Sequence, residues 1–158
     1  MKGAWACLFA AALALPGPCF AQARSTVTAI PVQGLRFGVL AAGIPSPVSP
    51  RDAARRAVTE LVGSGQVTLT FSLPAGLATE GGAVLPLHFG PTDGRIVFPR
   101  SEQVIEFDPN VPVSFSIPAG IGGAQVFLGG TAAPGARQPP GSYAGTITVH
   151  VQVANAAT

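Results

Sequence analysis

The chain has 158 residues, of which 10% are charged and 47% apolar, and its formal net charge is +2. So large an apolar fraction with so few charges argues against a disordered protein, and the length suits one domain. The charges nearly balance and no cluster of arginines alternates with aromatic residues, which argues against a nucleic-acid-binding protein.

The chain begins with a pattern typical of a secretory signal peptide, residues 1–23. Lys2 supplies the positive start, an apolar run follows, and Ala21-Gln22-Ala23 is a small-x-small cleavage site. The apolar run is too short for a permanent membrane helix, and no later run is long enough either. We therefore expect export through the inner membrane, no transmembrane segment in the mature protein, and a periplasmic, cell-surface or extracellular location.

Both cysteines, Cys7 and Cys19, lie in the segment that we expect to be removed. The mature protein would then enter an oxidising compartment without any disulfide, so its stability must come from core packing and backbone hydrogen bonds. Pro18 precedes Cys19 where a lipoprotein signal needs a small residue, and we therefore expect no lipid anchor.

Three stretches alternate apolar and polar residues with the period of two that is typical of a half-buried strand: residues 66–74, 111–118 and 142–153. In the last of them Gly145 takes an inward position, where we expect a bulge or a close contact. The inward apolar residues predicted for the three stretches are Val67, Leu69, Phe71, Leu73, Val111, Val113, Phe115, Ile117, Tyr143, Ile147, Val149, Val151 and Val153.

Shorter strand candidates lie between turns rich in glycine and proline. They are residues 26–32, 35–40, 83–89, 95–98, 104–107 and 124–130. Many short strands between such turns are typical of an antiparallel sandwich. We therefore expect an all-β fold, a single antiparallel immunoglobulin-like β-sandwich of about 7–9 short strands. It would form one domain over residues 24–158.

One segment, residues 52–62, fits a helix as well as a strand. Asp52 could cap a helix and Gly63 could end it, whereas alternate residues would face opposite ways in a strand. We favour a turn or helical bend at 52–55, followed by a strand from about Arg56 to Val62.

The sequence offers few groups for catalysis. His88 and His150 each lie in a predicted strand, where an exposed position is the simpler interpretation, and no serine occupies a G-x-S-x-G motif. No cysteine remains in the mature chain to act as a nucleophile. Four carboxylates could ligate Ca²⁺, although solvated turns are the favoured explanation because no dense acidic loop surrounds them: Asp93, Glu102, Glu106 and Asp108. We expect no enzyme, no cofactor and no metal.

Three stretches in a fixed order resemble a known family. Gly34–Leu40 contains an L-x-F-G element, Val126–Thr131 contains GGT, and Pro139–Val151 contains G-x-Y-x-G-T. Together they resemble a bacterial family of exported β-sandwich domains of unassigned function. That family is similar to spore coat protein U and, more distantly, to pilin subunits of the chaperone–usher pathway. The resemblance implies an immunoglobulin-like sandwich in an envelope or surface setting.

The chain also departs from pilins, which commonly carry a disulfide and an aromatic residue near the end of the last strand. Here the mature chain would have no cysteine, and its sequence finishes VQVANAAT. The resemblance therefore does not establish chaperone-assisted polymerisation. The residues expected to matter are packing and strand-pairing elements: Leu35, Phe37, Gly38, Phe127, Gly129, Gly130, Gly141, Tyr143, Gly145, Ile147 and Val149.

Residues 25–35 alternate modestly and could add a strand to a neighbouring molecule's open sheet. The same segment could pair within its own sandwich. We favour the intramolecular pairing because Pro31 and small inward residues would make a weak donor strand.

The leading hypothesis is a non-enzymatic exported structural or interaction protein of the bacterial envelope, such as a subunit of a coat, pilus-like or adhesive assembly. Its partner would be itself or another envelope protein, bound by β-strand addition. An alternative is a secreted ligand- or glycan-binding module, which would need aromatic platforms, and Tyr143 is the single tyrosine. A hydrolase would need convergent carboxylates such as Glu106 and Asp108. The sequence leaves open the role of the loop over residues 131–141.

Overall fold

The computed structural model describes residues 26–154, so the expected signal peptide lies outside the described residues. Within this range the chain forms strands and turns, and no helix there could cross a membrane. The twelve strands are β1 (Val27–Gln33), β2 (Ser46–Val48), β3 (Ala57–Gly63), β4 (Gly65–Ser72), β5 (Gly76–Ala78), β6 (Val84–His88), β7 (Gly94–Val97), β8 (Val104–Phe107), β9 (Val113–Ile117), β10 (Gly123–Leu128), β11 (Gly130–Ala132) and β12 (Thr148–Ala154). The protein is all-β, as the alternation predicts.

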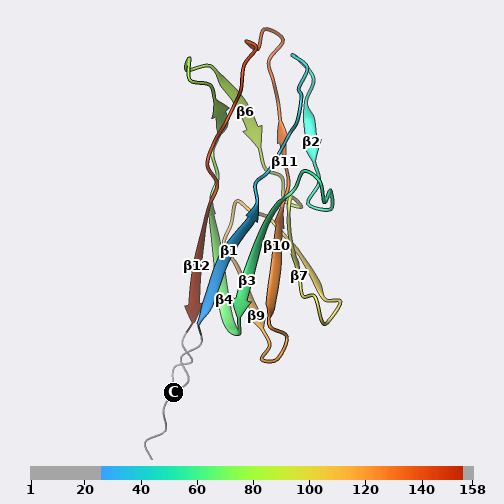
Figure 1. Cartoon of the computed structure of the whole chain (residues 1–158), viewed down its shortest axis with the longest axis vertical. Coiled ribbons are helices and arrows are strands. Elements are labelled where there is room, and N and C mark those ends of the chain that lie inside the picture. The colour runs from blue at the N-terminus through green and yellow to red at the C-terminus, as the bar shows by residue number, and fades with distance from the viewer. Residues whose placement is uncertain (1–25, 155–158) are drawn as a thin grey trace, which may run out of the picture.

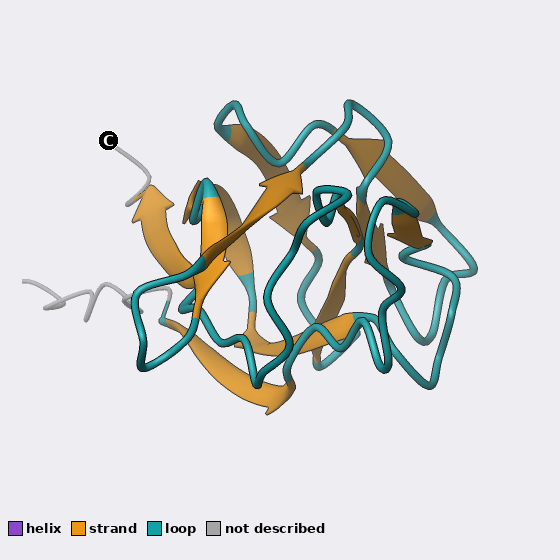
Figure 2. Ribbon diagram, turned by 90° about the horizontal axis from the view of Figure 1, so that it is seen from above, coloured by secondary structure: helices purple, strands orange, loops and turns teal. Residues whose placement is uncertain are grey.

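The strands form three antiparallel sheets. A five-stranded sheet, β1-β3-β10-β7-β8, and a three-stranded sheet, β12-β4-β9, enclose one core, and we call these two sheets the main sandwich. A four-stranded sheet, β2-β11-β6-β5, which we call the small sheet, lies at the other end of the long axis from the end of β12 (Figure 1). Seen along that axis, the strands surround the interior and loops cover much of the near end (Figure 2).

The core of the main sandwich is filled by the inward residues of both sheets. In β4 the predicted alternation is confirmed, since Val67 and Leu69 are fully buried and Phe71 is half-buried. The rings of Phe98 and Phe115 meet edge to face, with 6.0 Å between their centroids. Each fully buried large apolar side chain contributes roughly 1.5–3 kcal/mol. The buried residues of this core are Leu61, Val67, Leu69, Ile96, Phe98, Phe107, Phe115, Ile117, Ala124 and Val126.

A second, smaller core lies against the small sheet. It contains Phe37, Val48, Leu85, Leu87 and Ala132, with half-buried neighbours around them. The two cores are joined because β10 runs on into β11.

Gly129 stands at the junction between β10 and β11. A Cβ there would lie 2.2 Å from the carbonyl oxygen of Val48, so only glycine permits this close approach.

The segment before β3 resolves the helix-or-strand alternative in favour of a turn followed by a strand. The amides of Arg55 and Arg56 donate to the carbonyl of Asp52, and the Asp52 side chain accepts from the amide of Ala54 at 3.1 Å. The strand then begins at Ala57.

The intramolecular pairing of the N-terminal segment is also confirmed. β1 pairs along its length with β3, with a register shift between Pro31 and Gln33. The segment therefore belongs to its own sandwich in this structure.

Three expectations about strands are wrong. Residues 35–40 form a loop, in which Gly38 adopts a φ of 74° while Leu35 and Phe37 pack on the small sheet. Leu35 and Phe37 are apolar because they anchor this loop on the small sheet, and the alternation of apolar residues here does not mark a pleated strand. Val111, predicted to face inward, is 53% exposed because β9 begins two residues later.

The predicted C-terminal strand is also shorter than expected. Only Ala144 forms an isolated bridge, with Ala78, before the regular strand begins at Thr148. Gly145 therefore lies outside any strand, although the close contact expected there exists, since a Cβ would lie 2.9 Å from the Leu77 side chain. The twelve strands exceed the expected seven to nine because β2, β5 and β11 are three-residue strands, two of them in segments that look like turns.

Candidate functional site

An apolar groove opens along one side of the molecule, where β1 and β12 lie side by side at the ends of different sheets. The groove has a volume of about 580 Å³, and none of the residues that line it is charged. Its lining extends from β1 and β12 to Leu77 and Leu87 of the small sheet. We call it the β1–β12 groove.

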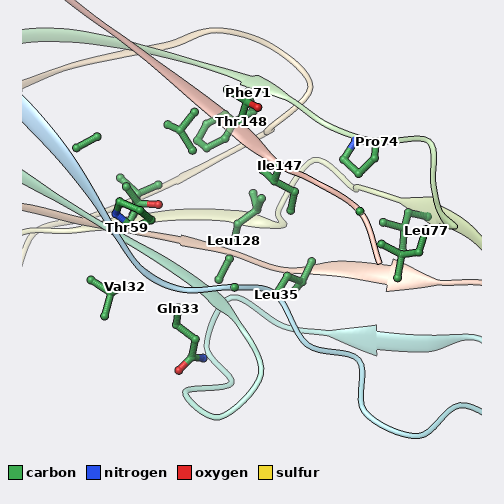
Figure 3. Close-up of a pocket in the computed structure, with 18 of the residues that line it drawn as sticks. Val32, Gln33, Leu35, Thr59, Phe71, Pro74, Leu77, Leu128, Ile147 and Thr148 are labelled. Carbon is green, nitrogen blue, oxygen red and sulfur yellow. The ribbon is translucent and has the colours of Figure 1, made fainter. Parts of the chain in front are cut away.

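Two walls and a floor form this groove (Figure 3). Ile147 and Thr148 lie on one wall and Val32 and Leu35 on the other, with Leu128 of β10 between them. Further apolar side chains extend the floor toward both cores: Phe71, Pro74, Leu77, Leu87 and Val126. The lining therefore offers apolar surface over the whole length of the groove.

The β1 wall is poorly suited to pair with a further strand through backbone hydrogen bonds. Pro31 has no backbone N–H to offer, and the register shift next to it distorts the strand. Val32 and Ile30 are nevertheless exposed, by 57% and 45%. Proline and bulges are devices by which natural edge strands resist further pairing.

The β12 wall has none of these devices. Its seven residues, Thr148–Ala154, include no proline and no acidic, lysine or arginine side chain. One edge pairs with β4 throughout, and among the described residues no strand pairs with the other. Val149 and Val151 are half-buried against the core, so the strand is held firmly while its outer edge stays open.

Some of the residues predicted from the sequence line the groove, and the rest lie in other parts of the molecule. Leu35, Phe37, Gly145, Ile147 and Val149 line the groove. The others lie elsewhere: Phe127 is buried on the outer face of the five-stranded sheet, Gly129 and Gly130 lie at the β10–β11 junction, and Gly38 and Gly141 are in exposed loops.

Tyr143 lines a second pocket, of about 730 Å³, together with Leu35, Phe37, Gly38 and Gly141. Its ring packs against the small-sheet core, and its hydroxyl donates to the carbonyl of Pro139 at 2.6 Å and accepts from Gln138 Nε2 at 2.7 Å. The hydrogen-bonding capacity of the hydroxyl is thus used inside the protein, which holds the loop before β12 in place.

The side chains considered for catalysis or metal binding do not converge. Both histidines are exposed as expected, and His150 Nε2 lies 3.1 Å from Ser72 Oγ. Glu106 pairs with Arg51 at 2.6 Å. The carboxylates of Asp93 and Asp108 accept backbone N–H groups in turns. Within residues 26–154 no three His, Cys, Asp or Glu side chains gather around a common point.

Several groove residues have no signal in the sequence that would have singled them out. Leu128 and Val126 look like ordinary core positions of a strand, and Val32 looks like the end of one. Pro31 is the one informative residue, because proline favours edge strands. Which two edges would face each other depends on the sheet order, and the local pattern does not contain that order.

Comparisons of the sequence with protein-family models and curated proteins, and of the fold with solved structures, find no match.

Proposed function

We propose that this protein is a non-enzymatic exported subunit of a bacterial envelope assembly, and that it binds an extended segment of another polypeptide in the β1–β12 groove. The segment would come from a second copy of the chain or from another envelope protein. The observation that carries the proposal is an uncharged apolar groove bordered by the open edge of β12.

Strand addition fits both surfaces of the groove. An incoming strand would satisfy the open N–H and C=O groups of β12, and its alternate side chains would enter the apolar groove. The uncharged lining predicts an uncharged segment with alternating apolar residues, because a buried unpaired charge is costly. Pairing would form on β12 rather than on β1, where Pro31 interrupts the edge.

The arrangement of polar groups supports a non-enzymatic role. Ser72 and His150 lie within hydrogen-bonding distance, but both are exposed on paired strands, and the structure shows no carboxylate bonded to His150. A nucleophile and base without a third orienting group do not make the arrangement that activated serines use.

The test is a photo-reactive residue placed at Val32 and, as the matched control, at Ile30 of the same strand. Both positions are exposed, but only Val32 lines the groove. In cells that naturally produce and export the protein, irradiation should give a covalent adduct from position 32 and little from position 30. The mass of the adduct distinguishes a second copy from another protein.

A companion experiment uses charge in the groove. Val32→Arg should abolish any multimers that survive in unboiled gel samples, whereas Ile30→Arg should leave them. Equal adducts at both positions, or multimers unaffected by Val32→Arg, would contradict strand addition in this groove. Both variants must keep the wild-type melting temperature for the comparison to count.

A further inference from the structure

Two arginines lie near one aromatic ring on the outer face of the five-stranded sheet. Phe127 of β10 lies opposite Arg95 of β7 in the strand register. The guanidinium of Arg56, which precedes β3, lies 3.5 Å from the centroid of the Phe127 ring. Phe127 is only 5% exposed, and Arg56 lies over one face of its ring. None of the three residues lines the β1–β12 groove.

The carboxylates nearest to these arginines are already bound by other arginines. Glu106 faces Arg95 across the β7–β8 pair, but its Oε1 lies 2.6 Å from Arg51 Nη2. Asp52 lies near Arg56, but its Oδ2 accepts from Arg55 Nε at 2.7 Å. In the described part of the chain, neither Arg56 nor Arg95 belongs to an ion pair.

Hydrogen-bond donors of both arginines are left without partners. The Nε atoms of Arg56 and Arg95 are buried, and no acceptor lies within bonding distance in the described residues. The one side-chain bond of Arg56 runs from Nη1 to the carbonyl of Pro50 at 3.3 Å. Burial, and after it the positive charge of Arg95, lowers the pKa of Arg56. Partly buried cations close together are unfavourable without a compensating anion.

We propose that Arg56 and Arg95 bind a small oxyanion, a carboxylate, phosphate or sulfate group, beside the ring of Phe127. Stacking on the ring holds the Arg56 guanidinium in a fixed plane, and the fork of N–H donors suits two oxygens of one anion. An anion shared by both guanidiniums offsets their mutual repulsion, and its oxygens can accept from the terminal Nη groups. This site is independent of the proposed function, since its residues lie outside the groove.

The first test compares the melting temperature of the folded protein in sodium sulfate, sodium phosphate and sodium acetate with that in sodium chloride at equal ionic strength. The concentration dependence of the shift gives the affinity for each anion. At least one of the three should raise the melting temperature beyond chloride. Arg95→Gln should weaken that affinity about tenfold or more, the loss expected for charge-assisted hydrogen bonds. The rank of the three anions identifies the class. The control is Arg137→Gln, because Arg137 is exposed in a loop and makes no ion pair in the described residues.

A second pair of variants uses the neighbouring ion pair. Arg51→Gln frees Glu106, which faces Arg95, so the carboxylate should compete and weaken anion binding. Glu106→Gln removes that competitor and should leave binding intact or tighten it. Arg56→Lys keeps the charge without the fork and should also weaken binding. An equal response in wild type and Arg95→Gln, or no effect beyond chloride, would overturn the proposal.

Discussion

The two open sides of the main sandwich differ although each ends in two edge strands. On one side β8 and β9 have four and five residues, β8 carries Glu106 in an ion pair, and Pro112 and Pro118 stand directly beyond the ends of β9. On the other side β1 and β12 have seven residues each, and an uncharged groove lies beside them.

The difference is that the edges on one side are protected against pairing with other chains, whereas the β12 edge on the other side is not. Short strands, charged side chains and proline are how natural sheets keep their edges from pairing with other chains. The β8–β9 side has all three, whereas β12 has none of them. A protein under general pressure to stay monomeric would protect both sides, so the unprotected β12 edge supports a role in pairing.

The largest effect is expected from a truncation on the protected side. Phe115 of β9 is 5% exposed and packs edge to face on Phe98. Phe115→Ala should lower the free energy of unfolding by about 3–5 kcal/mol, because both burial and a cavity are involved. On the groove side, Ile147→Ala should cost only about 1 kcal/mol, since Ile147 is half-buried and outside any strand.

Denaturant unfolding of the two variants measures both values. Ile147→Ala costing as much as Phe115→Ala would mean that the groove is closed in solution, and the comparison between the two sides would fail.

The next effect concerns the core that borders the groove. Phe37 is 8% exposed, packs on the small sheet and also lines the groove. Phe37→Ala should cost about 2–3 kcal/mol, less than Phe115→Ala, because the open groove already removes part of its packing. A melting temperature within about one degree of wild type would contradict its place in that core.

Substitutions at two glycines test how closely the two sides of the main sandwich are packed. A Cβ on Gly94 would lie 2.5 Å from the Phe107 ring of β8, whereas a Cβ on Gly145 would lie 2.9 Å from the end of the Leu77 side chain. Gly94→Ala should therefore destabilise by about 1–3 kcal/mol, and Gly145→Ala by less than about 1 kcal/mol, since the groove lets Leu77 move. Calorimetric melting of both variants measures the two destabilisations. A larger loss of stability in Gly145→Ala than in Gly94→Ala would disprove an open groove.

The smallest effect is expected from acid. The turn before β3 is tied to the end of β1, because Gln33 Nε2 donates to the carbonyl of Arg56 at 2.7 Å. Within this turn, the hydrogen bond from the Arg55 side chain holds the pKa of Asp52 below its ordinary value.

A depressed carboxyl pKa contributes stability above the ordinary value near 3.9, and that contribution is lost as pH falls through the depressed pKa. Asp52→Asn should therefore be slightly less stable than wild type at pH 7, and the gap should close as the pH falls through the depressed pKa of Asp52. Unfolding curves at pH 7 and at the lowest pH that keeps the fold measure this gap. A gap that persists unchanged in acid would show that the Asp52 charge contributes nothing.

The sequence predicts the protein's class and many of its strands with some precision. In β4 and β9 the alternating pattern places Val67, Leu69, Phe115 and Ile117 in the core, where the structure has them. It is less reliable where the chain crosses between layers. Leu35 and Phe37, and Tyr143 and Ile147, alternate as a strand would, yet lie in irregular segments. Burial alone imposes the apolar residues there, and a loop can bury them as well as a strand.

By itself the sequence determined that the described chain is all-β and which residues of β4 and β9 face the main core, because alternation with period two is a local property of a half-buried strand. Only the tertiary structure decided that β1 and β12 would be neighbouring open edges, that Phe71 and Leu128 would face a groove, and that Arg56 would lie over Phe127, the register partner of Arg95. Those contacts join segments far apart in the chain. They depend on sheet order and register, and one alternating sequence is compatible with more than one order and register.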